Sequence, residues 1–97
     1  MPHELIIKPE AELELVEALE WHEEQLARLG NRLFQEFNDI FNEIASNPEY
    51  FQKKYGNIRI RYTYKFNYGV HYIIEKDTVF ILAILHTSRK PNKPLWI

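Results

Sequence analysis

The sequence of 97 residues contains no cysteine. Disulfide bonds and thiolate metal sites are therefore excluded, and a reducing compartment is the natural expectation. The four histidines show no zinc-binding pattern, because His22-Glu23-Glu24 is not continued to a second histidine at the HExxH spacing. We therefore expect neither a bound metal nor a cofactor.

Glycine and serine are also scarce, with only three glycines and two serines in the chain. They leave little room for a phosphate-binding glycine loop or a nucleophile elbow, and neither motif is present. The longest apolar run, residues 79–85, is far too short to cross a bilayer. The first residues lack the basic stretch followed by an apolar run that is typical of a secretory signal peptide, so we do not expect one. We expect a soluble cytoplasmic protein with no membrane partner.

Charge is divided unevenly along the chain. Residues 1–50 carry 3 basic and 12 acidic side chains, a net charge of −9, whereas residues 51–97 carry 9 basic and 2 acidic ones, a net charge of +7. The overall charge of −2 hides this division. A basic half of this kind is suited to bind a polyanion or an acidic partner.

Hydrophobic periodicity predicts one α+β domain spanning residues 1–97, with the element order β-α-α-β-β-β. The two helices form a helical hairpin packed on one face of a small, mostly antiparallel sheet. The expected strands are residues 5–7, 58–66, 70–75 and 78–86, and the expected helices are residues 10–28 and 31–46. The strand at 78–86 is almost continuously apolar, which predicts a position in the middle of the sheet.

Turn-forming residues separate these elements. Pro9 suits the first turn of the first helix, because its missing N–H needs no partner there. Gly30 is expected just after the end of that helix, and Asn31 is expected to cap the next one. Pro48 ends the second helix, because a residue before proline avoids the helical region.

The segment 58–66 alternates apolar and polar residues at every step, so its side chains divide between two sheet faces. The apolar set, with Tyr62 and Tyr64, is expected to face the helices. Arg59, Arg61 and Lys65 are then expected on the open face, as a phosphate-binding surface. The alternative is a solvated strand face whose charges discourage edge-to-edge pairing.

The predicted central strand ends in His86, which is followed by Arg89 and Lys90. A histidine can transfer protons near neutral pH, and an arginine can bind a phosphate through two parallel hydrogen bonds. The alternative is that His86 only packs at the end of the strand and hydrogen-bonds to backbone. The residue types alone leave both interpretations open.

Five segments carry motifs in a fixed order. They are Ala18–Glu24 in the first helix, Ile44–Pro48 at the end of the second, Ile58-Arg59, the aromatic stretch Phe66–Tyr72, and His86–Pro91 followed by Trp96. Together they resemble the RelE/ParE superfamily of toxins from type II toxin–antitoxin systems. The pattern from His86 to Trp96 is more similar to the ParE-like, or plasmid-stabilisation, branch than to classical RelE.

This resemblance implies a growth-arresting toxin that is held inactive by a cognate antitoxin. RelE-like members cleave mRNA, usually on the ribosome, and ParE-like members inhibit DNA gyrase without being nucleases. For an mRNA endonuclease, the matching positions imply His86, Arg89 and Arg61 as catalytic residues. Arg59, Lys65 and Lys90 would then bind the substrate. A gyrase inhibitor and a non-toxic antitoxin-binding module are the alternatives, so the resemblance leaves open whether the protein is an enzyme.

The antitoxin is expected to cover the basic face or to add to a sheet edge. This expectation follows from the +7 charge of residues 51–97. Antitoxins of such systems often contribute a segment that becomes ordered on binding.

Overall fold

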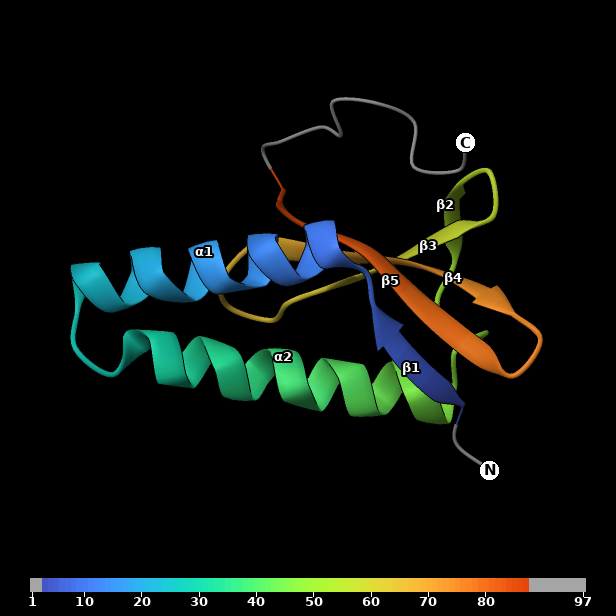
Figure 1. The fold of residues 1–97 in the computed structure, drawn as a ribbon, viewed down its shortest axis with the longest axis horizontal. Helices are drawn as coiled ribbons and strands as arrows, with labels where there is room; N and C mark the ends of the chain where they lie inside the picture. The colour runs from blue at the N-terminus through green and yellow to red at the C-terminus, as the bar shows by residue number, and fades with distance from the viewer. Residues whose placement is uncertain (1–2, 88–97) are drawn as a thin grey trace.

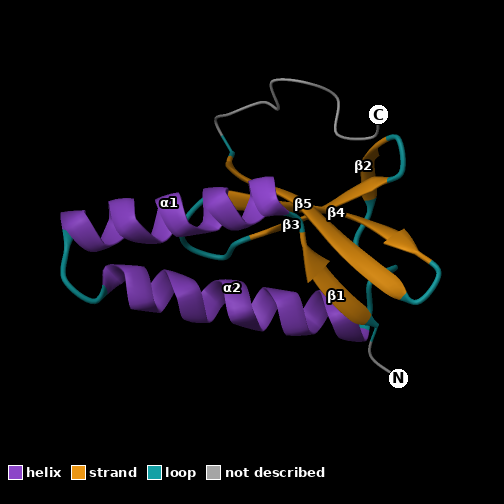
Figure 2. Cartoon of the chain, in the orientation of Figure 1, coloured by secondary structure: helices purple, strands orange, loops and turns teal. Residues whose placement is uncertain are grey.

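The computed structural model describes residues 3–87 and has an α+β fold in which two helices pack on a five-stranded sheet (Figure 1; Figure 2). The order of strands across the sheet is β1-β5-β4-β3-β2, with β1 parallel to β5 and the other neighbours antiparallel. The elements are β1 (Glu4–Ile7), α1 (Pro9–Gln25), α2 (Leu29–Ser46), β2 (Lys53–Tyr55), β3 (Ile58–Tyr62), β4 (Tyr68–Glu75) and β5 (Thr78–His86). The predicted fold class is confirmed, and β2 is an additional strand.

The hydrophobic core lies between the helical hairpin and one face of the sheet. Helix α2 contributes the fully buried Leu33, Phe37 and Ile44, while α1 contributes mainly small residues. Strand β5 lies between β1 and β4, as its apolar sequence predicted. Tyr72 of β4 is fully buried, and its hydroxyl donates a hydrogen bond to the carbonyl of Pro48 at 2.6 Å. This bond joins the sheet to the segment that follows α2.

The hairpin connection differs from the prediction. Gly30 does not follow the first helix but lies inside α2, where it is buried against α1. A Cβ atom at Gly30 would lie 2.7 Å from the carbonyl oxygen of Leu19, so only glycine lets the helices approach this closely. The turn is instead made by Arg28, which has a positive φ of 73°. The Glu23 carboxylate stabilises it by accepting hydrogen bonds from the backbone N–H groups of Arg28 (2.9 Å) and Gly30 (3.0 Å).

The orientation of β3 is the reverse of the prediction, because its arginines face the side of the sheet that the helices cover. Arg59 pairs with Tyr72 and Arg61 pairs with Val70, and both partners belong to the core beneath the helices. The arginines therefore project to the helix-bearing side. Tyr62 is 43% exposed and Tyr64 is 87% exposed, so neither is buried under the helices as expected.

The physical reason is that alternation shows which residues share a face but not which face the helices cover. Ile58 and Ile60 of β3 lie on the helix-free face with His71 of β4, which pairs with Ile60 and with Ala83 of β5. Ile58, His71 and Ala83 are all buried. Both faces of the sheet are thus apolar near its centre, and an apolar stripe on β3 fits either one.

Strand β3 also ends earlier than predicted. The chain leaves it at Tyr62 and makes a loop over residues 63–67. The Thr63 hydroxyl accepts a hydrogen bond from the N–H of Tyr68 at 2.9 Å, and Asn67 has a φ of 60°. The Glu36 carboxylate of α2 accepts hydrogen bonds from the N–H groups of Tyr64 and Lys65. Lys65 therefore lies in a loop anchored to α2 rather than on a strand face.

Candidate functional site

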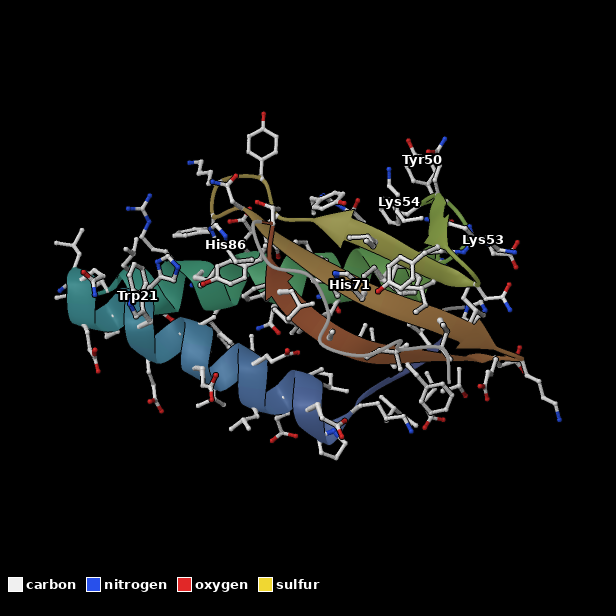
Figure 3. The ribbon with its side chains drawn as sticks, turned by 90° about the horizontal axis from the view of Figure 1, so that it is seen from above. Trp21, Tyr50, Lys53, Lys54, His71 and His86 are labelled. Atoms are coloured by element: carbon white, nitrogen blue, oxygen red, sulfur yellow. The ribbon has the colours of Figure 1, made fainter. Side chains whose placement is uncertain are left out.

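A cavity of about 510 Å³ lies between α1 and the adjoining ends of β4 and β5. The α1 residues that line it recur at helical spacing, so they form one stripe along the helix. Figure 3 shows Trp21 and His86 at the same end of the molecule. The lining residues are Glu14, Glu17, Ala18, Trp21, His22, Tyr68, Ile84, Leu85 and His86.

Aromatic rings form a continuous cluster along this cavity. His22 contacts Trp21 edge to face with 4.8 Å between ring centroids, and it contacts Tyr68 at 5.8 Å. Tyr68 in turn contacts His86 at 5.4 Å. Nε2 of His22 also lies within hydrogen-bonding distance of the Tyr68 hydroxyl, at 3.2 Å. The hydroxyl and the imidazole therefore orient each other at the wall of the cavity.

Two carboxylates and two histidines are among the residues that line the cavity. Burial, and secondarily the nearby His86, lower the pKa of His22, so its neutral form is favoured at pH 7. Glu14 Oε1 accepts a hydrogen bond from the N–H of Ile84 at 2.9 Å, which fixes this carboxylate against β5. Glu17 is the second carboxylate that lines the cavity.

Arg59 and Arg61 are held by other contacts. The Arg59 guanidinium donates to the carbonyl of Phe51 at 2.6 Å and to that of Glu49 at 3.2 Å. The Arg61 guanidinium donates to the Glu43 carboxylate at 3.4 and 3.3 Å and to the carbonyl of Tyr62. Arg59 thus contacts the segment that follows α2. Arg61 contacts the C-terminal part of α2 and the end of its own strand.

The structure does not bring these arginines together with His86. His86 pairs with Tyr68 on β4, and Arg61 pairs with Val70 on the far side of the same strand, so β4 separates them. Lys65 lies in the loop after β3. Arg89 and Lys90, also predicted as site residues, lie outside the described residues. His86 is the one predicted site residue among residues 3–87 that lines the cavity.

Sequence reasoning missed most of the cavity lining. Neither the charge pattern nor the motifs singled out Glu14, Glu17, Trp21 or Tyr68 as site residues. Their common face was visible in the spacing of residues 14, 17, 18 and 21 along one helix. What the sequence did not show is that the ends of β4 and β5 lie opposite this stripe.

A second polar contact was also missed, on the helix-free face. The Tyr55 hydroxyl lies 2.7 Å from Nδ1 of the buried His71. Burial lowers the pKa of His71 to about 4, so the imidazole is neutral and Nδ1 can accept this hydrogen bond. Burial, followed by the nearby Tyr62, raises the pKa of Tyr55. The pair joins β2 to β4 across β3.

The opposite end of the molecule is basic and aromatic. Figure 3 shows Tyr50, Lys53 and Lys54 grouped there, around β2. A shallow hollow of about 440 Å³ lies between this group and β3, lined in part by Tyr50, Lys54 and Tyr62. Lys53 and Lys54 are both exposed. Strand β2 is the last of the sheet, so no strand among residues 3–87 pairs with its outer edge.

Two classes of site receive no support from the described part of the chain. Residues 3–87 contain no group of three or more histidine, aspartate or glutamate side chains arranged to hold a metal ion. Within the same residues, no helix combines the length and the apolar character that a membrane span requires.

Comparison with known proteins identifies the family. Residues 5–91 match the family model described as the ParE toxin of the type II toxin–antitoxin system parDE. Among solved structures, a chain of the chromosomal ParDE toxin–antitoxin system from P. aeruginosa superposes with a TM-score of 0.77 at 9% sequence identity, covering 87% of this chain and 95% of that one. At this identity the superposition shows a shared fold, and no curated protein sequence matches. The family match covers most of the sequence, and the chain therefore belongs to the ParE toxin family of type II toxin–antitoxin systems.

Proposed function

We propose that this ParE-family toxin arrests growth by binding DNA gyrase rather than by cleaving RNA, and that its cognate antitoxin prevents this binding. Membership of the family supports the toxin role and the antitoxin partner. DNA gyrase is proposed as the target because the ParE-like members of the superfamily act on gyrase.

The single observation that carries this choice is the separation of Arg61 from His86. Cleavage of RNA by its own 2′-hydroxyl needs a base, an acid and positive charge around one phosphate. Among the described residues, the arginines donate to carbonyl and carboxylate groups near α2, and His86 lies across β4 from them. This arrangement supports binding without cleavage.

RNA cleavage is the second candidate, and the position of His86 favours it. His86 lines an open cavity beside His22 and Tyr68, where proton transfer to a ligand would be possible. In this alternative His86, Arg89 and Arg61 are the proposed catalytic residues. Arg59, Lys65 and Lys90 are the proposed substrate-binding residues.

The antitoxin is proposed to engage the edge strand β2. No strand among residues 3–87 pairs with its outer edge, where a partner strand could add, and the exposed Lys53 and Lys54 favour an acidic segment. This replaces Arg59 and Arg61 as the expected contact surface, because their guanidinium groups already have partners within the chain.

The test is to induce the chain alone and to measure three quantities: growth, the integrity of cellular mRNA, and plasmid supercoiling by purified gyrase with added toxin. We expect growth arrest, intact mRNA and inhibited supercoiling. Co-expression of the antitoxin encoded beside the toxin gene is the control, and it should restore growth. Cleaved mRNA with unchanged supercoiling at toxin excess would overturn the proposal and favour the second candidate. Normal growth would indicate a non-toxic antitoxin-binding module.

A further inference from the structure

The cavity between α1 and the ends of β4 and β5 is lined both by carboxylates and by aromatic rings, and one kind of ligand can contact both. Two carboxylates, Glu14 and Glu17, line it from α1. Four rings, those of Trp21, His22, Tyr68 and His86, also line it. No lysine or arginine is among the described lining residues. A ligand with a positive charge on a flat, weakly hydrated group fits this combination.

An arginine side chain meets these requirements better than a lysine. The guanidinium group is planar, so it can stack on an aromatic ring while its N–H groups donate to a carboxylate. Trp21 is 56% exposed, and its ring lies at 82° to that of His22, so the two rings are not stacked and indole surface stays accessible. A lysine ammonium is a compact, strongly hydrated charge and gains less from such a surface.

The titratable groups that face the cavity support a cationic ligand at neutral pH. They are Glu14, Glu17 and His22 from α1, Tyr68 from β4 and His86 from β5. Burial and the proximity of His86 lower the pKa of His22, which keeps this imidazole uncharged near pH 7. A phosphate or another anion would approach the side chains of Glu14 and Glu17 and is therefore disfavoured there.

We propose that this cavity is a docking site for an arginine side chain of the antitoxin. The proposal rests on the antitoxin partnership stated above and adds a second contact to it. Lys53 and Lys54 lie at the other end of the molecule from Trp21 and His86 (Figure 3). An antitoxin that contacts both ends would present acidic residues to β2 and a basic residue to the cavity.

The chemistry of the cavity can be tested without the antitoxin and without toxicity. The chain contains two tryptophans, so Trp96→Phe leaves Trp21 as the only tryptophan that reports on the cavity. N-acetyl-arginine amide is titrated into this variant while Trp21 fluorescence is followed. N-acetyl-citrulline amide, which has nearly the same shape without the charge, is the matched probe. We expect saturable quenching by the arginine probe only.

Substitutions on α1 then locate the binding site. Glu17→Gln removes a lining carboxylate and should weaken arginine binding about fivefold, as expected for an exposed charge pair. Glu20→Gln makes the same change on the same helix outside the cavity lining and should leave binding unchanged. Equal quenching by citrulline, stronger binding of AMP, or absence of saturation would overturn the assignment.

The final measurement is the affinity of the toxin variants for the antitoxin. Purified antitoxin should bind the Glu17→Gln toxin more weakly than the Glu20→Gln toxin, and substitution of a single antitoxin arginine should reproduce that loss. If the arginine probe binds only after Arg89→Gln, the occupant is the chain's own arginine and the proposal is wrong. Because growth arrest is measured separately with the unaltered toxin, failure of the docking site and failure of the proposed function give different results.

Discussion

Arg61 of β3 and Glu43 of α2 form an ion pair in which Nη2 lies 3.3 Å from Oε2, with the two side chains 24% and 46% exposed. The pair joins β3 to the C-terminal part of α2, and the Arg61 guanidinium also lies over the ring of Phe51, 5.3 Å from its centroid. An arginine that the sequence suggested for phosphate binding therefore has a structural partner in the free protein.

The first prediction concerns this pair. Because it is partly exposed, Glu43→Gln should lower the free energy of unfolding by at most about 1 kcal/mol. Arg61→Ala should lower it somewhat more, since it also loses the contact of the guanidinium with the ring of Phe51. A double-mutant cycle by urea unfolding, repeated at high salt, would measure the coupling. A toxin that loses growth arrest in Arg61→Ala while keeping its stability would indicate a functional role for the guanidinium instead.

The second prediction concerns the contact between the helices at Gly30. Alanine normally stabilises a helix relative to glycine by about 1 kcal/mol. Here a Cβ would meet the Leu19 carbonyl at 2.7 Å, so Gly30→Ala should instead destabilise the fold by about 1–3 kcal/mol through separation of α1 and α2. Thermal unfolding shows whether Gly30→Ala raises or lowers the stability of the fold. Asn38→Ala, on the exposed side of α2, is the control and should be neutral or slightly stabilising; a stabilised Gly30→Ala would contradict the close approach.

The fold was largely predictable because local signals agreed along the chain. The helical period of 31–46, the proline at 48 and the continuous apolar run of 78–86 each specify an element type and its limits. Strand β2 was missed because it has three residues and pairs irregularly with β3, so it has almost no period to detect. The side of the sheet to which Arg59 projects was not predictable, because both faces are apolar near the centre.

The cavity could not be predicted from local sequence patterns, because it depends on how the elements pack in the folded protein. His86, which lines the cavity, was predicted as a site residue because it ends an apolar strand and a histidine can transfer protons near neutral pH. Trp21 and Glu17 gave no separate signal, since an amphipathic helix exposes many such side chains without any function. Their significance appears only when the ends of β4 and β5 lie opposite them, and this depends on the pairing of strands far apart in the sequence.

The third prediction concerns Tyr72 and the carbonyl of Pro48. Tyr72→Phe removes the buried hydrogen bond of 2.6 Å and leaves the carbonyl without this donor, so it should destabilise the protein by about 1–3 kcal/mol. Tyr64→Phe, at a residue that is 87% exposed, is the matched control and should change little. Chemical denaturation of both variants gives the comparison. Equal stability of the two would show that the Tyr72 hydroxyl contributes nothing.

The pKa of Tyr72 adds a test at alkaline pH. Burial raises this pKa from 10.0 to about 12, and the charge of Arg59 acts in the opposite direction. The unfolded tyrosine loses its proton first, so the stability due to Tyr72 is complete below pH 10 and is lost between pH 10 and 12. The Tyr72→Phe variant should lack this component of the alkaline loss of stability.

The fourth prediction concerns His71. Burial lowers its pKa from 6.5 to about 4, so the unfolded state binds a proton more readily than the folded state between these values. Stability due to neutral His71 is complete above pH 6.5 and falls as the pH is lowered toward 4, by up to about 3 kcal/mol. His71→Gln should lower stability at pH 7 and flatten this dependence. His22 titrates in the same direction, so the comparison needs His22→Gln as a second variant.

The last prediction concerns the edge strand β2. If an acidic antitoxin segment adds to this edge, Lys54→Glu should weaken antitoxin binding about fivefold at low salt, because an exposed charge pair contributes up to about 1 kcal/mol and reversal makes it repulsive. Lys76→Glu makes the same charge change in the turn between β4 and β5 and should leave the affinity close to that of the unaltered toxin. Calorimetric titration at low and at high salt checks both variants. The difference between them should nearly vanish at 1 M salt, where the Debye length is about 3 Å. If Lys76→Glu weakened binding as much as Lys54→Glu, the antitoxin would respond to the overall charge of the toxin and not to the β2 edge.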